Sequence, residues 1–275
     1  MVHDPKPRNI HKATVRDRLL HHAIYRLLYP SFDTSFIHDS YSCRDKKGTH
    51  KAFQQLVRYS RKVSENHTSA RFALKMDIRK FFDSIDHEVL LGLLRKKIVD
   101  PLVMELLENI LRSFERSPGK GMPLGNLASQ LFANVYMDPL DKFVKHRLKA
   151  KYYLRYADDF LILASNPDEL MGYFVEINCF LKNTLKLSLH PDKISLRKFS
   201  WGIDFVGYVA RPHYSLPRRK TVKWAFSKLH KIHGIDPSPL GKTVKSYLGY
   251  LSHVSAHGYS EDIREFLREP QHYRS

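Results

Sequence analysis

Residues 151–165 read KYYLRYADDFLILAS, and this stretch decides the fold. Aromatic and aliphatic residues run on both sides of a short turn at 157–159, a pattern that predicts two strands joined as a hairpin. Two adjacent carboxylates, Asp158 and Asp159, lie at its tip. Like charges at that separation repel each other, and a bound cation relieves the repulsion. From this segment alone two interpretations stay open, an ordinary polar turn and a cation-binding site.

A third carboxylate follows a second predicted strand. Residues 71–78 read RFALKMDI, in which Phe72, Leu74 and Met76 occupy alternate positions. Alternation with a period of two predicts a half-buried strand, and Asp77 stands at its far end. Three carboxylates from two adjoining strand ends could hold two Mg²⁺ ions about 3.5–4 Å apart. Such a pair activates an attacking hydroxyl and stabilises the leaving oxygen in phosphoryl transfer.

The composition predicts a globular protein with a polyanionic partner. The chain has 275 residues, 43% of them hydrophobic, which supports a buried core and excludes a disordered tail. Lys and Arg number 46 against 28 Asp and Glu, so the formal net charge is +18. This excess favours nucleic acid first and an anionic membrane surface second. No apolar stretch reaches the roughly 18 residues of a spanning helix, so we expect no membrane partner.

Cysteine usage and the first residues indicate the compartment. Cys43 and Cys179 give neither a disulfide framework nor a paired-cysteine zinc motif. The opening segment, MVHDPKPRNIHK, is basic, and no apolar run of a secretory signal follows it. We therefore expect a reducing cytosol and a cytoplasmic protein.

Helix signals alternate with the predicted strands. Helices are predicted to begin at or just after Val15 (ending before Pro30), Thr49, Asp86, Asp100, Gly125 (with an interruption near Pro139) and Asn166. A further strand is predicted around 204–209, followed by a basic helical segment. Short strands that carry acids, with helices packed behind them, indicate an α+β fold.

Five motifs in this chain resemble those of the reverse transcriptase palm, in the same order. They are DIRKFFDSIDH at 77–87, GMPLGNLASQ at 121–130, YADD at 156–159, LSLHPDKI at 187–194 and FVGYV at 205–209. A single motif would be weak evidence, but five in register are specific. The Tyr-x-Asp-Asp form also favours a reverse transcriptase over viral RNA-copying polymerases, which typically carry Gly-Asp-Asp.

The resemblance implies a right-hand polymerase fold and an activity. It implies fingers at 1–70, a palm at 71–212 with an antiparallel sheet carrying YADD and a helical fingers part at about 88–120, and a short helical thumb at 213–275. The family usually has a fingers strand before the DPKPR turn, and we expect that strand to be missing here. The implied activity is RNA-directed DNA polymerisation with two Mg²⁺ ions, or Mn²⁺. The implied partners are an RNA template, a DNA or RNA primer and dNTPs.

Site residues follow from matching the family motifs position by position. The metal-binding positions are Asp77, Asp158, Asp159 and the main-chain carbonyl of Ile78. Lys193 matches a lysine that protonates the departing pyrophosphate, although a surface lysine is an equally open interpretation. The other implied nucleotide-binding residues are Arg8, Arg16, Ile78, Lys80, Phe81, Phe82, Leu124 and Gly125, and the implied primer grip is Phe205, Gly207 and Tyr208.

Two of these positions bear on substrate choice. Phe82 matches the bulky residue that excludes a ribose 2′-hydroxyl; a core aromatic is the alternative. Most of the family carries Pro-Gln-Gly where this chain has Pro123, Leu124 and Gly125. Together with Ser129 and Gln130, this is similar to the enzymes of diversity-generating retroelements. Leu124 could instead simply pack against the following helix.

Three functional alternatives stay open. The diversity-generating resemblance implies copying errors at template adenines and a small basic accessory protein as a possible partner. Group II intron-like enzymes are the nearest competing subfamily. A catalytically weak nucleic-acid-binding scaffold that keeps the palm fold is the alternative of a different class. The basic, aromatic-containing segment 218–250 suits a thumb that follows a duplex backbone, or it is a solvated helical face.

Overall fold

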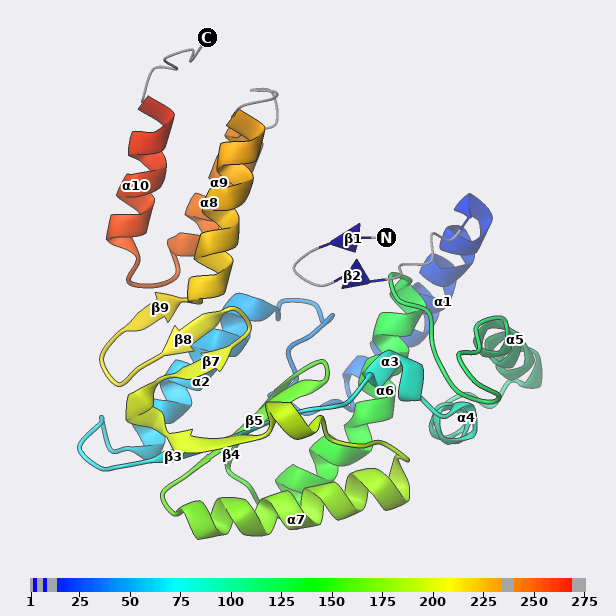
Figure 1. Cartoon of the computed structure of the whole chain (residues 1–275). Helices are drawn as coiled ribbons and strands as arrows, with labels where there is room; N and C mark the ends of the chain where they lie inside the picture. Colours follow the sequence, from blue (N-terminus) through cyan, green and yellow to red (C-terminus); the bar gives the residue numbers. More distant parts are fainter. Residues whose placement is uncertain (1, 4–6, 9–13, 234–239, 269–275) are drawn as a thin grey trace. The chain divides into compact units, whose positions relative to one another are not determined.

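A computed structural model describes residues 2–3, 7–8, 14–233 and 240–268 of the chain. The backbone divides into two compact units (Figure 1). Unit 1 consists of Met1–Ala52 and Phe72–Arg197, and unit 2 consists of Phe53–Arg71 and Lys198–Ser275. The division groups 53–71 and 198–212 with the segment assigned to the thumb, whereas the boundaries of fingers, palm and thumb remain predictions.

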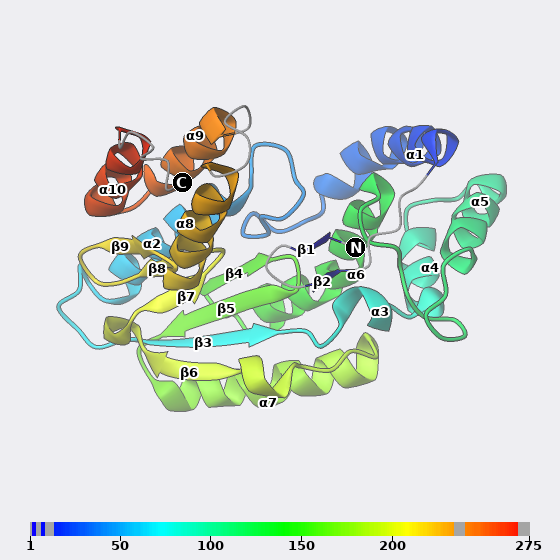
Figure 2. The same ribbon diagram turned by 45° about the horizontal axis from the view of Figure 1, so that its top comes forward.

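Unit 1 is built on a four-stranded sheet in the order β4-β5-β3-β6. The predicted hairpin is β4 (Tyr152–Tyr156) and β5 (Asp159–Ala164), and β3 (Phe72–Asp77) pairs antiparallel with β5. The fourth strand is β6 (Ser195–Lys198). Figure 2 shows α7 (Pro167–Thr184) running along this sheet.

The helices of unit 1 begin close to their predicted caps. Asp86 caps α4 (His87–Arg95) by accepting from the Val89 amide at 3.1 Å, and Asp100 caps α5 (Pro101–Arg112). An Asn166 cap precedes α7. The remaining helices are α1 (Val15–Asp33), α3 (Phe81–Ser84), α6 (Leu127–Lys142) and the first turn of α2 (Thr49–Val63).

The main core lies between the sheet and these helices. Tyr153, Phe160 and Ile162 of the hairpin are fully buried together with Tyr136 of α6 and Leu181 of α7. Each such side chain contributes roughly 1.5–3 kcal/mol by leaving water. The Tyr136 hydroxyl donates to the Leu185 carbonyl at 2.6 Å, so its polar end is also satisfied.

Two prolines lie within helices. Pro30 lies inside α1, which continues to Asp33, so the helix end predicted before it is wrong. Pro139, near which the sequence predicts an interruption, lies inside α6. Beyond α6 the chain continues as a π-helix over Phe143–Arg147. Proline removes one backbone donor and crowds the preceding turn, but it does not stop a helix whose flanking residues are held by packing. Leu28, Phe32, Leu140 and Val144 are all buried around these prolines and supply that packing.

The N-terminal segment also differs from expectation. A two-residue strand, β1 (Val2–His3), precedes the turn and pairs antiparallel with β2 (Pro7–Arg8). The expected absence of a strand before DPKPR is therefore wrong, because two residues of backbone are enough to pair with Pro7–Arg8.

Unit 2 contains a small sheet and a helical bundle. The predicted single strand near 204–209 is a hairpin of β7 (Ile203–Phe205) and β8 (Tyr208–Ala210), extended by β9 (Ser215–Pro217). Three helices follow, α8 (Arg219–His233), α9 (Leu240–Leu251) and α10 (His257–Arg268). They enclose a core of Leu229, Val244, Leu251, Ala256 and Ile263. Among the described residues, no helix has the length and apolarity needed to cross a membrane.

Candidate active site

The antiparallel register of the sheet gathers three carboxylates at one end. Asp77 on β3 lies directly opposite Asp159 on β5. Asp158 sits in the turn, and its carbonyl accepts from the Ile78 amide at 3.2 Å. The sequence predicted this convergence from strand ends alone, and the structure places Asp77, Ile78, Asp158 and Asp159 together.

The LSLHPDKI segment is fixed to the end of β3 by backbone hydrogen bonds. The His190 amide donates to the Asp77 carbonyl at 2.8 Å, and the Arg79 amide donates to Ser188 at 2.9 Å. A short 3₁₀ turn at Pro191–Lys193 then directs the Lys193 ammonium to 2.6 Å from the Asp77 carboxylate. Lys193 is thereby brought to the carboxylates, although they are distant in sequence.

A second lysine faces the carboxylates from β3 itself. The Lys75 ammonium lies 3.0 Å from Asp159 Oδ2. Burial raises the pKa of Asp159 to about 6; Lys75 opposes this shift, while Asp77 and Asp158 add to it. The other carboxylate oxygen, Oδ1, is buried without a hydrogen-bond partner. Sequence reasoning overlooked Lys75, although period-two alternation places it on the same strand face as Asp77.

The donor set fits divalent cations by its chemistry. Carboxylate oxygens are the ligands that Mg²⁺ and Mn²⁺ prefer, and the unpartnered Oδ1 of Asp159 is an acceptor available to one. No group of three or more His, Cys, Asp or Glu side chains in the described part of the chain is already disposed around a metal position. The ammonium groups of Lys75 and Lys193 supply the positive charge beside Asp159 and Asp77.

A fully buried arginine supports the turn that carries Asp158. The Arg155 guanidinium donates to the Asp141 carboxylate at 2.7–3.0 Å, and neither side chain is exposed. It also donates to the carbonyl of Ala157 at 2.9 Å, inside the turn. Ala157 has a φ of 55°, which a residue with a side chain seldom adopts. Arg155 therefore holds the strained residue next to Asp158.

Additional contacts complete the Arg155 network. Its guanidinium donates to Asn134 at 3.3 Å and Ser40 at 3.0 Å, and the Tyr153 hydroxyl donates to Asp141 at 2.6 Å. Although burial opposes the charge, Asp141 raises the pKa of Arg155. Sequence reasoning missed this pair. Its one signal was an arginine inside an otherwise apolar strand.

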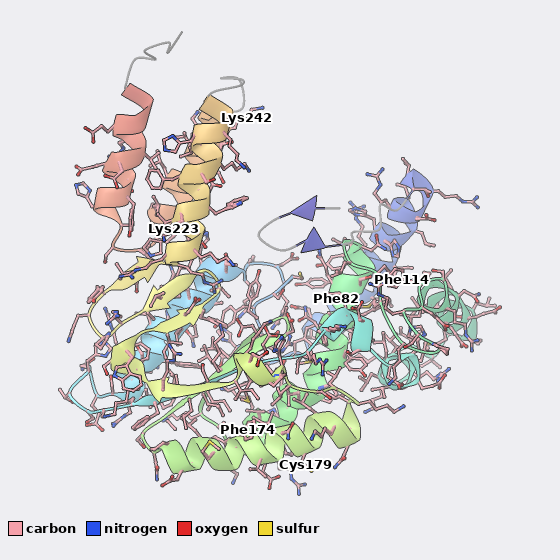
Figure 3. The ribbon with its side chains drawn as sticks, viewed as in Figure 1. Phe82, Phe114, Phe174, Cys179, Lys223 and Lys242 are labelled. Atoms are coloured by element: carbon pink, nitrogen blue, oxygen red, sulfur yellow. The ribbon has the colours of Figure 1, made fainter. Side chains whose placement is uncertain are left out.

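The nucleotide-binding candidates lie on several elements. Lys80 is exposed with a φ of 47°, Phe81 is buried in the core, and Phe82 on α3 is half-buried beside it (Figure 3). Gly125 has a φ of 101°, a conformation that favours glycine, just before α6. Leu124 is half-buried, and Arg16 is exposed in the first turn of α1. The side chain of Arg8 lies outside the described residues. These assignments stay predictions.

The predicted primer grip forms the tight turn of the β7–β8 hairpin. Gly207 has a φ of 97° and Phe205 is fully buried. Tyr208 stacks on Tyr250 of α9 with ring centroids 4.6 Å apart, and its hydroxyl donates to the Tyr250 carbonyl at 3.1 Å. The Tyr250 hydroxyl donates to the Gly207 carbonyl. Tyr250, which sequence reasoning did not assign, thus fixes this turn to the helical bundle.

Comparison with known proteins identifies the family. The Reverse transcriptase (RNA-dependent DNA polymerase) family matches residues 3–210. Since that match covers most of the chain, the protein belongs to the reverse transcriptase family.

Two curated relatives are similar over about three quarters of this chain. Protein YkfC of Escherichia coli (strain K12) is 24% identical over 232 residues, which cover 70% of this chain and 60% of YkfC. Group II intron-encoded protein LtrA of Lactococcus lactis subsp. cremoris is 26% identical over 274 residues, 75% of this chain and 45% of LtrA. The chain thus spans only about half the length of these relatives. The likeness to LtrA supports a group II intron-like type of reverse transcriptase.

Solved structures share the fold. An apo telomerase from Candida Tropicalis truncated from its C-terminal domain matches with a TM-score of 0.55 at 14% identity, over 70% of this chain and 43% of that chain. A telomerase from Candida albicans, in complex with a TWJ fragment of telomeric RNA, matches with a TM-score of 0.52 at 13% identity, over 90% and 47%. The right-hand polymerase fold predicted from the motifs is confirmed.

The raised pKa of Asp159 predicts a pH-dependent stability. Because the folded pKa of Asp159, about 6, lies above the ordinary 3.8, the contribution of Asp159 to the free energy of unfolding falls as pH rises from 4 to 7. Without divalent cations, the free energy of unfolding of Asp159→Asn relative to wild type should therefore be about 2–3 kcal/mol higher at pH 7 than at pH 4. Urea unfolding at both pH values measures the gain. A difference between the two proteins that does not change with pH would contradict the assignment.

The Arg155 network predicts a separation of stability from activity. Arg155→Met leaves Asp141 charged and buried, which should cost about 3–5 kcal/mol of unfolding free energy. Arg155→Met/Asp141→Asn removes both charges and keeps an acceptor for Tyr153, so most of that stability should return. Primer extension should stay about two- to tenfold low, because the Ala157 carbonyl still lacks its donor. A stable double variant with wild-type extension would show that Arg155 does not position the turn.

Proposed function

We propose that this chain is an RNA-directed DNA polymerase that extends a primer along an RNA template. The observation that carries the proposal is the gathering of Asp77, Asp158 and Asp159 at one end of a reverse transcriptase palm sheet. Three converging carboxylates are costly without a cation, and a scaffold that only binds nucleic acid has no need of them.

The carboxylates are the proposed ligands of two Mg²⁺ ions. Asp77, Asp158, Asp159 and the carbonyl of Ile78 would hold them. When bound, the metal ions would activate the primer hydroxyl and stabilise the leaving oxygen. In this proposal the Lys75 and Lys193 ammonium groups, 3.0 and 2.6 Å from Asp159 and Asp77, offset part of the negative charge of the carboxylates before metal binds.

Two side chains are proposed to act on the incoming nucleotide. Lys193 is 40% exposed and already beside Asp77, so its ammonium can donate a proton to departing pyrophosphate. Phe82 is half-buried against the core, which holds its ring rigidly enough to exclude a 2′-hydroxyl. Lys80, Phe81, Arg16, Leu124 and Gly125 complete the proposed nucleotide pocket.

The primer and template are proposed to bind unit 2 as well. The tight turn at Phe205, Gly207 and Tyr208 would hold the primer terminus. The exposed lysines of α8 and α9, among them Lys223 and Lys242 in Figure 3, would contact phosphates. DNA or RNA could serve as primer, and a small basic accessory protein is a possible further partner.

The subfamily is proposed from the central motif. Leu124 in place of Gln favours an error-prone enzyme of a diversity-generating retroelement. The similarity to a group II intron-encoded protein favours the second candidate, a group II intron-like enzyme of ordinary accuracy. The test of accuracy below separates the two.

The first test concerns the carboxylates. Asp158→Asn should abolish primer extension on an RNA template with Mg²⁺, because one ligand charge is lost. RNA affinity and melting temperature should stay near wild type, since the change relieves repulsion. Asp168→Asn, at an exposed position in α7, is the matched control and should extend normally. Extension by Asp158→Asn within tenfold of wild type would refute the metal assignment.

The second test concerns copying accuracy. Leu124 cannot make the hydrogen bonds of a Gln beside the nascent base pair. Each such bond contributes roughly 0.5–1.5 kcal/mol, and about 1.4 kcal/mol is tenfold in rate. Wild type should misincorporate mainly at template adenines, and Leu124→Gln should do so several-fold less when a defined RNA is copied and the products sequenced. Equal error rates in two active enzymes would remove Leu124 from the mechanism and favour the second candidate.

A further inference from the structure

Helix α2 has one buried and one strongly basic face. Phe53, Leu56 and Ser60 are almost completely buried, and the Phe53 ring lies 5.0 Å from Tyr208 of the predicted primer grip. Arg58 and Arg61 are exposed on the other side of the helix. Because an α-helix is roughly 10 Å across, the basic face is a surface separate from the grip turn.

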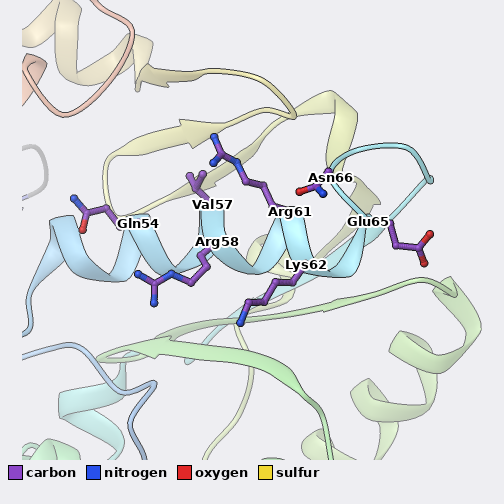
Figure 4. A pocket seen from close by; sticks show the side chains of 7 residues that line it. All are labelled: Gln54, Val57, Arg58, Arg61, Lys62, Glu65 and Asn66. Atoms are coloured by element: carbon purple, nitrogen blue, oxygen red, sulfur yellow. The ribbon is translucent and has the colours of Figure 1, made fainter.

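The exposed face of α2 contains a hollow of about 470 Å³. Its residues come from α2 and from the turn that follows it: Gln54, Val57, Arg58, Arg61, Lys62, Glu65 and Asn66. Figure 4 shows Arg58 and Lys62 pointing to one side of the helix axis and Arg61 to the other. We refer to Arg58, Arg61 and Lys62 as the α2 cation face.

The three cations lack partners within the described residues. No carboxylate or hydrogen-bond acceptor is recorded within reach of their side-chain nitrogens, whereas Arg44, Arg155 and Arg218 are each paired with an aspartate. The one acid of the hollow, Glu65, lies 3.5 Å from Arg71. The hollow therefore has a net positive charge that only a ligand or solvent can neutralise.

The kinds of residues in the hollow indicate how it would bind. Successive helical turns rise 5.4 Å, so the cations form a row rather than a single point. Gln54 and Asn66 add neutral donors at the two ends, and Val57 gives an apolar patch between them. No aromatic side chain lines the hollow, so no base can stack there. Cations and amides without aromatics match the sugar–phosphate backbone, which is contacted independently of sequence.

We infer that the α2 cation face binds the phosphodiester backbone of the template or primer strand, as a second nucleic-acid surface outside the catalytic carboxylates and the grip turn. The choice of nucleic acid as ligand rests on the proposed function. The existence of a ligand-binding surface is inferred from the placement and the unpaired state of its three cations.

The test compares two triple variants of equal charge. Arg58→Gln/Arg61→Gln/Lys62→Gln removes the α2 cation face. Arg147→Gln/Lys149→Gln/Lys182→Gln removes three exposed cations from unit 1. Affinity for an RNA–DNA duplex is measured by fluorescence anisotropy across a salt series, with circular dichroism to confirm folding. A third variant, Arg58→Lys/Arg61→Lys/Lys62→Arg, keeps the charge.

The α2 variant should lower the slope of log affinity against log salt by about 2–3, since each phosphate contact contributes about 0.9. The loss should be equal for two unrelated duplex sequences. The unit 1 variant should change the slope by less than about 1, and the charge-keeping variant should match wild type.

Three outcomes would overturn the inference. Equal slope changes in both triple variants would mean that only net charge matters. A loss confined to one sequence would mean base recognition. Unchanged duplex affinity with lost affinity for poly-glutamate would mean a protein-binding surface. Binding is measured without catalysis, so a chain that binds as expected but extends no primer would refute the proposed function and leave the α2 surface standing.

Discussion

The buried ion pair between Arg155 and Asp141 is the constraint on which the catalytic end of the palm depends. Two charges without solvent contact are tolerated only when each is paired and hydrogen-bonded. Here the Arg155 guanidinium donates hydrogen bonds to Asp141, Asn134, Ser40 and the Ala157 carbonyl. Since these groups come from three separate segments, the pair connects the hairpin, α6 and the loop before α2 at one point.

The carboxylates depend on that rigidity. Asp77 and Asp159 face each other in register, and Asp158 follows the strained Ala157. Their mutual repulsion would open a loosely held turn. Lys75 and Lys193 offset this repulsion through ion pairs with Asp159 and Asp77. Arg155 holds the turn through its hydrogen bond to the Ala157 carbonyl. Burial, more than the neighbouring Asp77 and Asp158, raises the pKa of Asp159, and a bound cation would oppose that shift.

In unit 2 the turn at Gly207 is held by a neutral side chain, that of Tyr250. The grip turn at Gly207 is fixed by the Tyr250 hydroxyl and by stacking of Tyr250 on Tyr208, while Arg218 pairs with Asp204 nearby. In each unit a polar side chain donates to a carbonyl of a turn that contains a left-handed residue. Arg155, on the strand that leads into the turn, donates to Ala157, and Tyr250 of α9 donates to Gly207. Surfaces meant for nucleic acid, such as the proposed α2 cation face, in contrast keep their charges unpaired.

The sequence by itself determined the local elements and the family. Alternation gave β3 and the hairpin, Asp86 and Asp100 were readable as caps, and five ordered motifs indicated the palm. These features depend on neighbouring residues or on motif order, so they can be predicted from a single sequence. Only the tertiary structure decided the contacts between residues that are distant in sequence. These are the pairing of Arg155 with Asp141, the approach of Lys193 to Asp77, and the hydrogen bond from Tyr250 to Gly207. Pro30 and Pro139 stay inside helices for the same reason, because packing from other elements outweighs a local preference to stop.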